Sequence, residues 1–123
     1  ELAKERKLQL SRAESLAATL ERIESMAPTD RELALGVHKM ALSIYPDFEV
    51  KTWYGMPAYY KDGQVILFFQ DGEKFKTRYC TVGFQQAASL DEGELWATSF
   101  ALTKMSNSAS KQLRQLISKS LGL

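Results

Sequence analysis

An unusual run of aromatic residues is the most direct candidate for a binding site. Two aromatic pairs, Trp53-Tyr54 and Tyr59-Tyr60, flank a turn expected over Gly55-Met56-Pro57. Neighbouring residues of a strand point to opposite faces of a sheet, so both members of a pair cannot lie in a core on one side of it. One member of each pair is therefore expected to line a pocket, and the flexible, polarizable side chain of Met56 is expected to form part of the same lining. The alternative is that helices cover both faces of the sheet and the whole run is core.

Three basic residues, Lys74, Lys76 and Arg78, alternate along one face of a strand expected over Phe75–Val82. The same face continues with apolar residues, so it begins basic and ends buried. Lys76 and Arg78 would then hold an anion at the rim of a groove. The competing interpretation is an exposed strand end whose cations prevent edge-to-edge pairing, and the alternation with apolar residues favours it.

The chain has one histidine, His38, and one cysteine, Cys80. His38 lies off the centre of the apolar stripe of an expected helix, with no second ligand at helical spacing, which predicts a surface or helix-edge residue. Cys80 lies in an apolar strand, which predicts a buried and unreactive thiol. A catalytic Cys–His pair would require the two side chains to meet, and nothing in the sequence supports that arrangement.

Metal binding would depend on carboxylates, because one cysteine and one histidine cannot build a zinc cage. Two acidic groups are candidates, one on the first helix and one around a turn (Glu14, Glu21 and Glu24; Asp91, Glu92 and Glu94). Lys7 and Arg22 are interspersed with the first group, which favours a solvated face with weak ion pairs over a cation site. The residues themselves therefore predict no cofactor.

Length and composition are typical of one small domain. A chain of 123 residues with 45% hydrophobic and 25% charged residues predicts a single globular domain over residues 1–123. Sixteen Lys and Arg residues against fifteen Asp and Glu residues leave a net charge of +1, which predicts no nucleic-acid partner. No apolar run reaches the ~18 residues that span a bilayer, so no membrane partner is expected. A single unpaired cysteine favours a cytoplasmic location.

Apolar spacing predicts helices at both ends of the chain. Repeats of three and four residues over positions 13–23 and 33–44 predict two helices separated by Pro28, and the short joint between them predicts an antiparallel helical hairpin. Thr29 and Glu32 match a capping box at the start of the second helix. A C-terminal helix is expected over residues 109–121, after cap residues that include Ser106.

The middle of the chain predicts an antiparallel sheet of about five strands. An extended segment over Phe48–Tyr54 is followed by Asp62-Gly63 and Asp71-Gly72, each expected to form the turn of a β-hairpin. Val65–Phe69 is apolar at every position, which predicts a central strand covered on both sides. A last strand is expected over Leu95–Leu102. Helices at both ends of such a sheet define an α+β domain.

Three segments resemble the YdhG-like family of small bacterial proteins: W-Y-G-M-P-A-Y-Y-K-D-G, K-F-K-T-R-Y and V-G-F-Q-Q-A-A-S-L. The family pattern is matched at Gly55, Met56, Pro57, Tyr59 and Gly63, within a likeness that covers residues 30–121. The resemblance implies an α+β fold. It also implies iron binding, because one family member is described as a frataxin-like iron chaperone. Such a site depends on a dense acidic face, whereas the first helix mixes both signs of charge.

The leading hypothesis is a non-enzymatic binding protein with an aromatic-lined pocket or groove on the sheet, for a small molecule or a protein. Eight residues are expected to form it: Trp53, Tyr54, Met56, Tyr59, Phe84 and Trp96 as the lining, with Lys76 and Arg78 as polar anchors. The alternatives are iron delivery, implied by the resemblance, and a protein–protein interaction module, as monomer or homodimer, that uses exposed apolar strand surface.

Overall fold

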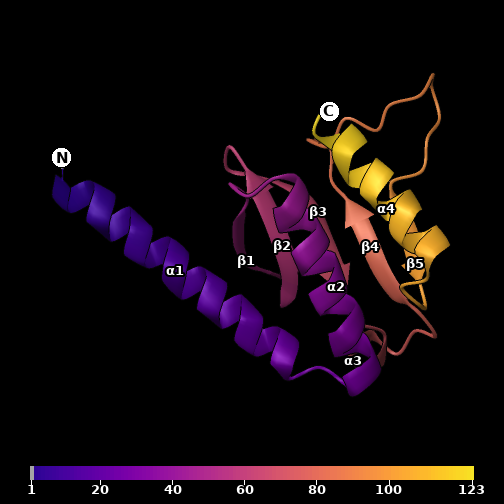
Figure 1. The fold of residues 1–123 in the computed structure, drawn as a ribbon, viewed down its shortest axis with the longest axis horizontal. Helices are drawn as coiled ribbons and strands as arrows, with labels where there is room; N and C mark the ends of the chain where they lie inside the picture. Colours follow the sequence, from indigo (N-terminus) through magenta and orange to yellow (C-terminus); the bar gives the residue numbers. More distant parts are fainter. Residues whose placement is uncertain (1) are drawn as a thin grey trace.

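The computed structural model describes residues 2–123, and the chain has the predicted α+β fold (Figure 1). A pair of helices precedes a five-stranded antiparallel sheet, and one helix follows it. The elements are α1 Leu2–Glu24, α2 Pro28–Ile44, β1 Glu49–Trp53, β2 Met56–Lys61, β3 Gln64–Gln70, α3 Gly72–Phe75, β4 Cys80–Phe84, β5 Ser99–Leu102 and α4 Asn107–Ser120. No helix within residues 2–123 is both long and apolar enough to cross a membrane.

The strands lie side by side in chain order, and each is antiparallel to the one before it. Tyr54-Gly55 joins β1 to β2 with φ angles of 51° and 75°, and Asp62-Gly63 joins β2 to β3 with φ angles of 52° and 77°. Two-residue hairpin turns whose twist matches that of the flanking strands require a positive φ at both positions. The Asp62-Gly63 hairpin is therefore confirmed. The expected turn at Gly55-Met56-Pro57 is wrong, because Met56 already pairs with Trp53 in the ladder.

A short helix, and not a hairpin turn, connects β3 to β4. Asp71 precedes α3, Gly72 opens it, and strand pairing resumes only at Cys80. A Cβ at position 72 would lie 3.0 Å from the carbonyl oxygen of Tyr79, so this close approach requires glycine. The predicted hairpin at Asp71-Gly72 is wrong, and so is the first half of the strand predicted over Phe75–Val82.

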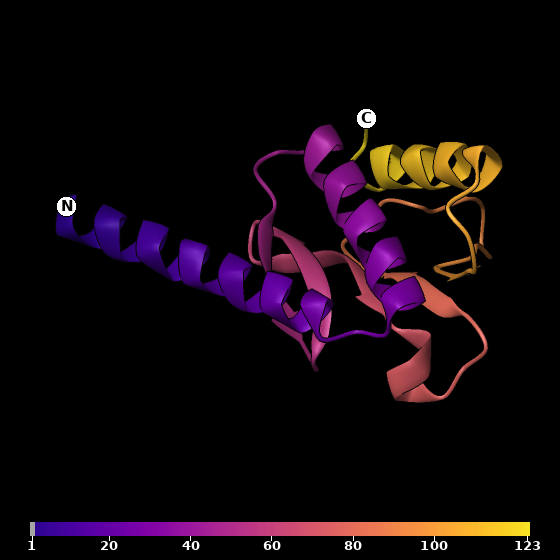
Figure 2. The same ribbon diagram turned by 60° about the horizontal axis from the view of Figure 1, so that its bottom comes forward.

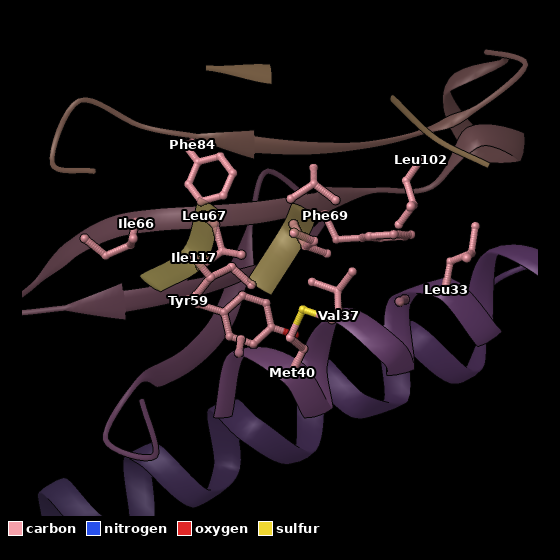
Figure 3. Packing of buried hydrophobic residues seen from close by; sticks show 14 of the residues in the cluster. Leu33, Val37, Met40, Tyr59, Ile66, Leu67, Phe69, Phe84, Leu102 and Ile117 are labelled. Carbon is pink, nitrogen blue, oxygen red and sulfur yellow. The ribbon is translucent and has the colours of Figure 1, made fainter. Parts of the chain in front are cut away.

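The hydrophobic core lies between the sheet and the helices α2 and α4, and α1 packs against β1 on the same side (Figures 1 and 2). The strands contribute alternate residues to it, in rows set by the register, such as Val50 opposite Tyr59 and Tyr59 opposite Leu67. Figure 3 shows Tyr59 and Leu67 in this core, with Val37 and Met40 of α2. We call this side the helix face of the sheet.

The opposite side of the sheet, which we call the open face, carries the remaining alternate residues. The register places Lys51 opposite Ala58, Ala58 opposite Phe68, and Phe68 opposite Gly83. A Cβ at Gly83 would lie 2.2 Å from Cζ of Phe68, so the ring of Phe68 lies directly on the glycine. Ala58 is fully buried although it does not belong to the core of the helix face. Aromatic side chains of the sheet therefore cover part of the open face.

The helix ends confirm one predicted cap and correct another. Ser106 caps α4, since its Oγ accepts a hydrogen bond of 3.1 Å from the Ala109 N–H. The capping box at Thr29 is wrong, because α2 begins one residue earlier at Pro28 and no side chain caps it. Proline in the first turn of a helix has no N–H that would need an acceptor, and its fixed φ suits the helix, so the helix starts there without the box.

Candidate functional site

Trp53 is the centre of an aromatic cluster on the open face. Its ring meets that of Tyr54 edge-on, with centroids 4.9 Å apart, and lies tilted against Phe68 at 5.3 Å. Trp53 and Phe68 are half-buried, whereas Tyr54, in the turn after β1, is 82% exposed. Edge-on and tilted arrangements match the charge distribution of aromatic rings and hold such a cluster in a fixed geometry.

A cation and another tyrosine extend this cluster along β1 and β2. The Nζ of Lys51 lies 4.6 Å from the ring centroid of Tyr60, within the range of a cation–π interaction. The same Nζ lies 3.7 Å from Oε2 of Glu49. Burial, followed by the charge of Glu49, raises the pKa of Tyr60. Tyr60 is therefore a neutral ring at physiological pH. We call Trp53, Tyr54, Tyr60 and Phe68 the aromatic platform.

A hollow of about 210 Å³ adjoins the platform at Trp53. The rest of its lining comes from the start of β3 and from the segment after β4, with three amide side chains and two small apolar ones: Gln64, Gln85, Gln86, Val65 and Ala87. An amide side chain both donates and accepts hydrogen bonds without carrying a charge. The hollow therefore suits an uncharged ligand with hydrogen-bonding edges that stacks on Trp53.

The structure divides the predicted lining residues between the two faces of the sheet. Trp53 and Tyr54 belong to the platform, and Met56 is buried directly opposite Trp53 in the ladder. Tyr59 and Phe84 are buried in the core of the helix face. The expectation that all these aromatic residues line one pocket is therefore wrong, since the sheet itself separates Tyr59 and Phe84 from Trp53.

The remaining predicted site residues lie in the connections. Lys76 is the left-handed cap at the end of α3, and Arg78 lies in the exposed segment before β4, where its guanidinium is 5.3 Å from the ring centroid of Tyr79. Trp96 lies in the long connection between β4 and β5 and is 37% exposed. None of the three lines the hollow beside Trp53. Lys76 and Arg78 are not on a strand, so the predicted basic strand face is wrong.

Sequence reasoning missed Phe68, Gln85 and Gln86 as members of the site. The unbroken apolar run of β3 did carry a signal for Phe68, because such a strand must present large side chains to both faces. No comparable signal marks the glutamines, whose position depends on how the chain leaves β4. The N–H of Gln85 donates a hydrogen bond of 3.1 Å to the carbonyl of Ile66, which fixes that exit.

His38 is buried and bonded, which corrects its predicted place at the surface. Its Nδ1 shares a hydrogen bond of 2.9 Å with the hydroxyl of Tyr59 in the core. Burial, followed by the charge of Lys39, lowers the pKa of His38. The ring is therefore neutral at pH 7 and anchors α2 to β2.

His38 is expected to make stability depend on pH. The unfolded chain has the ordinary histidine pKa near 6.5 and the folded chain a lower one, so the stabilisation is complete above pH 6.5 and is lost as pH falls through the folded value. Urea unfolding between pH 7.5 and 5 should show a steeper loss of unfolding free energy in the wild type than in His38→Gln. Equal slopes would contradict the buried neutral imidazole.

Cys80 is buried, as predicted, and its thiol is not activated. Its Sγ donates to Oδ1 of Asp30 over 3.2 Å, and Oδ2 of the same carboxylate accepts the Glu73 N–H over 3.0 Å. Burial is the main cause that raises the pKa of Cys80 to about 12, and Asp30 adds to it. A thiol that stays protonated is a poor nucleophile. His38 is bonded to Tyr59 and not to this thiol, so no Cys–His pair forms.

The two acidic groups do not gather into a metal centre. Glu14, Glu21 and Glu24 are exposed on α1, and Glu92 forms an ion pair with Lys119. The same ion pair lowers the pKa of Glu92. Among the residues that the structure describes, no three His, Cys, Asp or Glu side chains lie close enough together to hold a metal ion.

Comparisons with protein-family models, with curated proteins and with solved structures give no match. The YdhG-like resemblance of residues 30–121 therefore stays a prediction. The aromatic platform and its adjoining hollow are the candidate site on geometry alone, because they combine half-buried rings, a concavity and convergent uncharged polar groups.

Proposed function

We propose that the chain is a non-enzymatic binding protein whose aromatic platform holds an uncharged ligand with a planar ring. The observation that carries this proposal is the half-buried ring of Trp53, which lies between Tyr54 and Phe68 and borders the hollow of about 210 Å³. The unpaired thiol of Cys80 supports a cytoplasmic setting for this function.

Stacking would supply most of the binding energy. A planar ring on a tryptophan gains roughly 1–3 kcal/mol, and the gain tolerates different ring types because every such ring has a π-face. The amides of Gln64, Gln85 and Gln86 would select among rings by hydrogen bonding to their edges. Lys51, the cation over the platform ring of Tyr60, is already engaged by Glu49, and the hollow beside Trp53 is lined by no charged side chain.

The positions of the reactive side chains support binding without catalysis. Cys80 and His38, the two residues that the sequence offers for nucleophilic or general-base chemistry, both lie on the helix face of the sheet. The platform lies on the open face. A ligand on Trp53 therefore has the whole sheet between it and either group, which is incompatible with the contact that catalysis requires.

Fluorescence titration tests this proposal. The chain has two tryptophans, so Trp96→Phe leaves Trp53 as the sole indole fluorophore. Adenosine, thymidine and 4-nitrophenyl β-glucoside are the probes, because each is an uncharged planar ring with hydrogen-bonding edges. At least one should change Trp53 emission saturably, with a dissociation constant below about 1 mM.

Two variants show whether the platform is the site. Trp53→Ala should weaken binding of that probe at least tenfold, measured by calorimetry, whereas Trp53→Phe should keep most of it because a ring remains. Trp96→Phe, on the β4–β5 connection, is the matched control and should leave the affinity unchanged. Equal affinity of Trp53→Ala and the wild type, or no response to any of the three probes, would refute the proposal.

A further inference from the structure

Tyr54 has a backbone conformation that a tyrosine rarely adopts. It is the first residue of the β1–β2 turn, and its φ angle is 51°. Asp62 stands at the same position of the β2–β3 turn, with a φ angle of 52°. Glycine, asparagine and aspartate accept a positive φ far more readily than a bulky side chain, for which it is an outlier. The β1–β2 turn therefore holds a tyrosine at a position that disfavours it.

Burial does not offset the cost of this conformation, because the side chain of Tyr54 is 82% exposed. The conformation does change where the ring lies. Neighbouring residues of a strand point to opposite faces, whereas the ring centroids of Trp53 and Tyr54 are only 4.9 Å apart. The left-handed backbone at Tyr54 thus breaks the alternation and brings a second ring beside Trp53 on the open face. The strained residue serves the site and not the core.

The Tyr54 ring has room to move relative to Trp53. A flat ring between two parallel rings needs about 3.5 Å on each side, so the two outer rings must be roughly 7 Å apart. The two centroids lie 4.9 Å apart, with the ring planes inclined by 73°. Exposed side chains change rotamer within nanoseconds, so the Tyr54 ring can swing from this edge-on contact to lie parallel to Trp53. The pair can therefore close on a flat ring from both sides.

The hollow beside Trp53 determines which ring edge fits. Its polar lining consists of three amides, those of Gln64, Gln85 and Gln86, and includes no charged side chain. An amide carries a donor next to an acceptor. Glutamine uses this pair to bind adenine at its N6 amine and N7 together. The lining therefore fits a heterocycle whose edge has a donor and an acceptor side by side.

We propose that the ligand of the aromatic platform is a nucleobase, free or as a nucleoside, which Tyr54 clamps against Trp53 while the glutamines bind its edge. The clamp rests on the proposed function, because it requires a ligand ring on Trp53. It adds the chemical class of that ring and the role of the strained tyrosine. A nucleotide offers the same edge, but no charged side chain lines the hollow to hold its phosphate.

Matched analogues test the class of ligand by calorimetry. Purine riboside is adenosine without its 6-amino donor, and N3-methylthymidine is thymidine without its N3–H. The nucleoside that binds more tightly should lose about fivefold in affinity in its analogue, and its 5′-monophosphate should bind no more tightly than the nucleoside. Equal binding of nucleoside and analogue, or tighter binding of the monophosphate, would overturn the assignment. Binding of 4-nitrophenyl β-glucoside alone would also overturn it, while leaving the proposed function standing.

Turn variants test the clamp with the same nucleoside. Tyr54→Asn should weaken binding about fivefold without lowering the melting temperature, because asparagine suits a positive φ, whereas Tyr54→Phe should keep the affinity because a ring remains. Asp62→Asn, at the same position of the next turn, is the matched control and should leave the affinity unchanged. A lower melting temperature of Tyr54→Asn would make the tyrosine structural and contradict the clamp. If Trp53→Ala weakens binding but Tyr54→Asn does not, the platform is the site and the clamp is wrong.

Discussion

Replacing Tyr59 by alanine is expected to lower the free energy of unfolding by about 3–5 kcal/mol, as for other large aromatic residues in cores. Tyr59 is 0% exposed, its ring meets Phe48 at 5.9 Å, and its hydroxyl is bonded to His38. The substitution opens a cavity between the sheet and α2 and leaves the imidazole without its partner. Urea denaturation followed by circular dichroism at pH 7 measures the loss.

Tyr60→Ala is the matched control, because the same side chain is removed one residue further along β2. Tyr60 is half-buried on the open face, so its loss should cost about 1 kcal/mol or less, as at partly exposed positions. If both substitutions lowered the free energy of unfolding equally, the side chain of Tyr59 would not point into the core, and this register of β2 would be wrong.

Removing the guanidinium of Arg22 is expected to cost about 3 kcal/mol of stability, because it leaves a buried carboxylate unpaired. Arg22 donates from one terminal nitrogen to Oδ1 of Asp71 over 2.9 Å and from Nε to the carbonyl of Gly55 over 2.9 Å. The two side chains are 18% and 4% exposed. This one residue thereby ties α1 to the β1–β2 turn and to the start of α3. Chemical denaturation of Arg22→Ala measures its contribution.

Two comparisons isolate the ion pair. In a double-mutant cycle, Arg22→Ala combined with Asp71→Ala should be less destabilised than the sum of the single variants, because no charge is left buried without a partner. Glu92→Gln, which breaks the exposed ion pair with Lys119, should cause no measurable change. Strict additivity in the cycle would contradict the buried pair.

The regular elements were predictable because their signals are local. The apolar repeat of the helices, the Asp62-Gly63 turn and the Ser106 cap all depend on residues within one turn of each other, and all three are confirmed. The failure at Asp71-Gly72 has a long-range cause. Asp71 pairs with Arg22, which lies 49 residues away, and Oδ2 of Asp30, 43 residues away, accepts the Glu73 N–H in the first turn of α3. The local pattern contains neither contact.

The site was only half predictable, because register decides which aromatic residue faces which side. A tight turn at Tyr54-Gly55, in place of the expected turn over Gly55-Met56-Pro57, begins β2 at Met56 and directs Tyr59 into the core. A shift of one residue in a strand exchanges its two faces. The sequence marks Trp53 and Tyr59 equally as candidates, and only the register separates the open face from the core.

His38 shows the same limit in a helix. Its position off the centre of the apolar stripe predicts exposure. The hydroxyl of Tyr59 on β2 forms a hydrogen bond with the imidazole, which offsets the cost of burying this polar ring. No pattern within α2 contains that information, because the partner lies 21 residues away.

The central claim is that Trp53 on the open face contacts a planar ring ligand. The most direct test is a ¹H–¹⁵N correlation spectrum of the wild-type protein during titration with the probe that binds best among the three. The two indole N–H signals belong to Trp53 and Trp96. The Trp53 signal is predicted to shift saturably while the Trp96 signal stays in place. A Trp53 signal that remains unmoved at saturating ligand would contradict the claim.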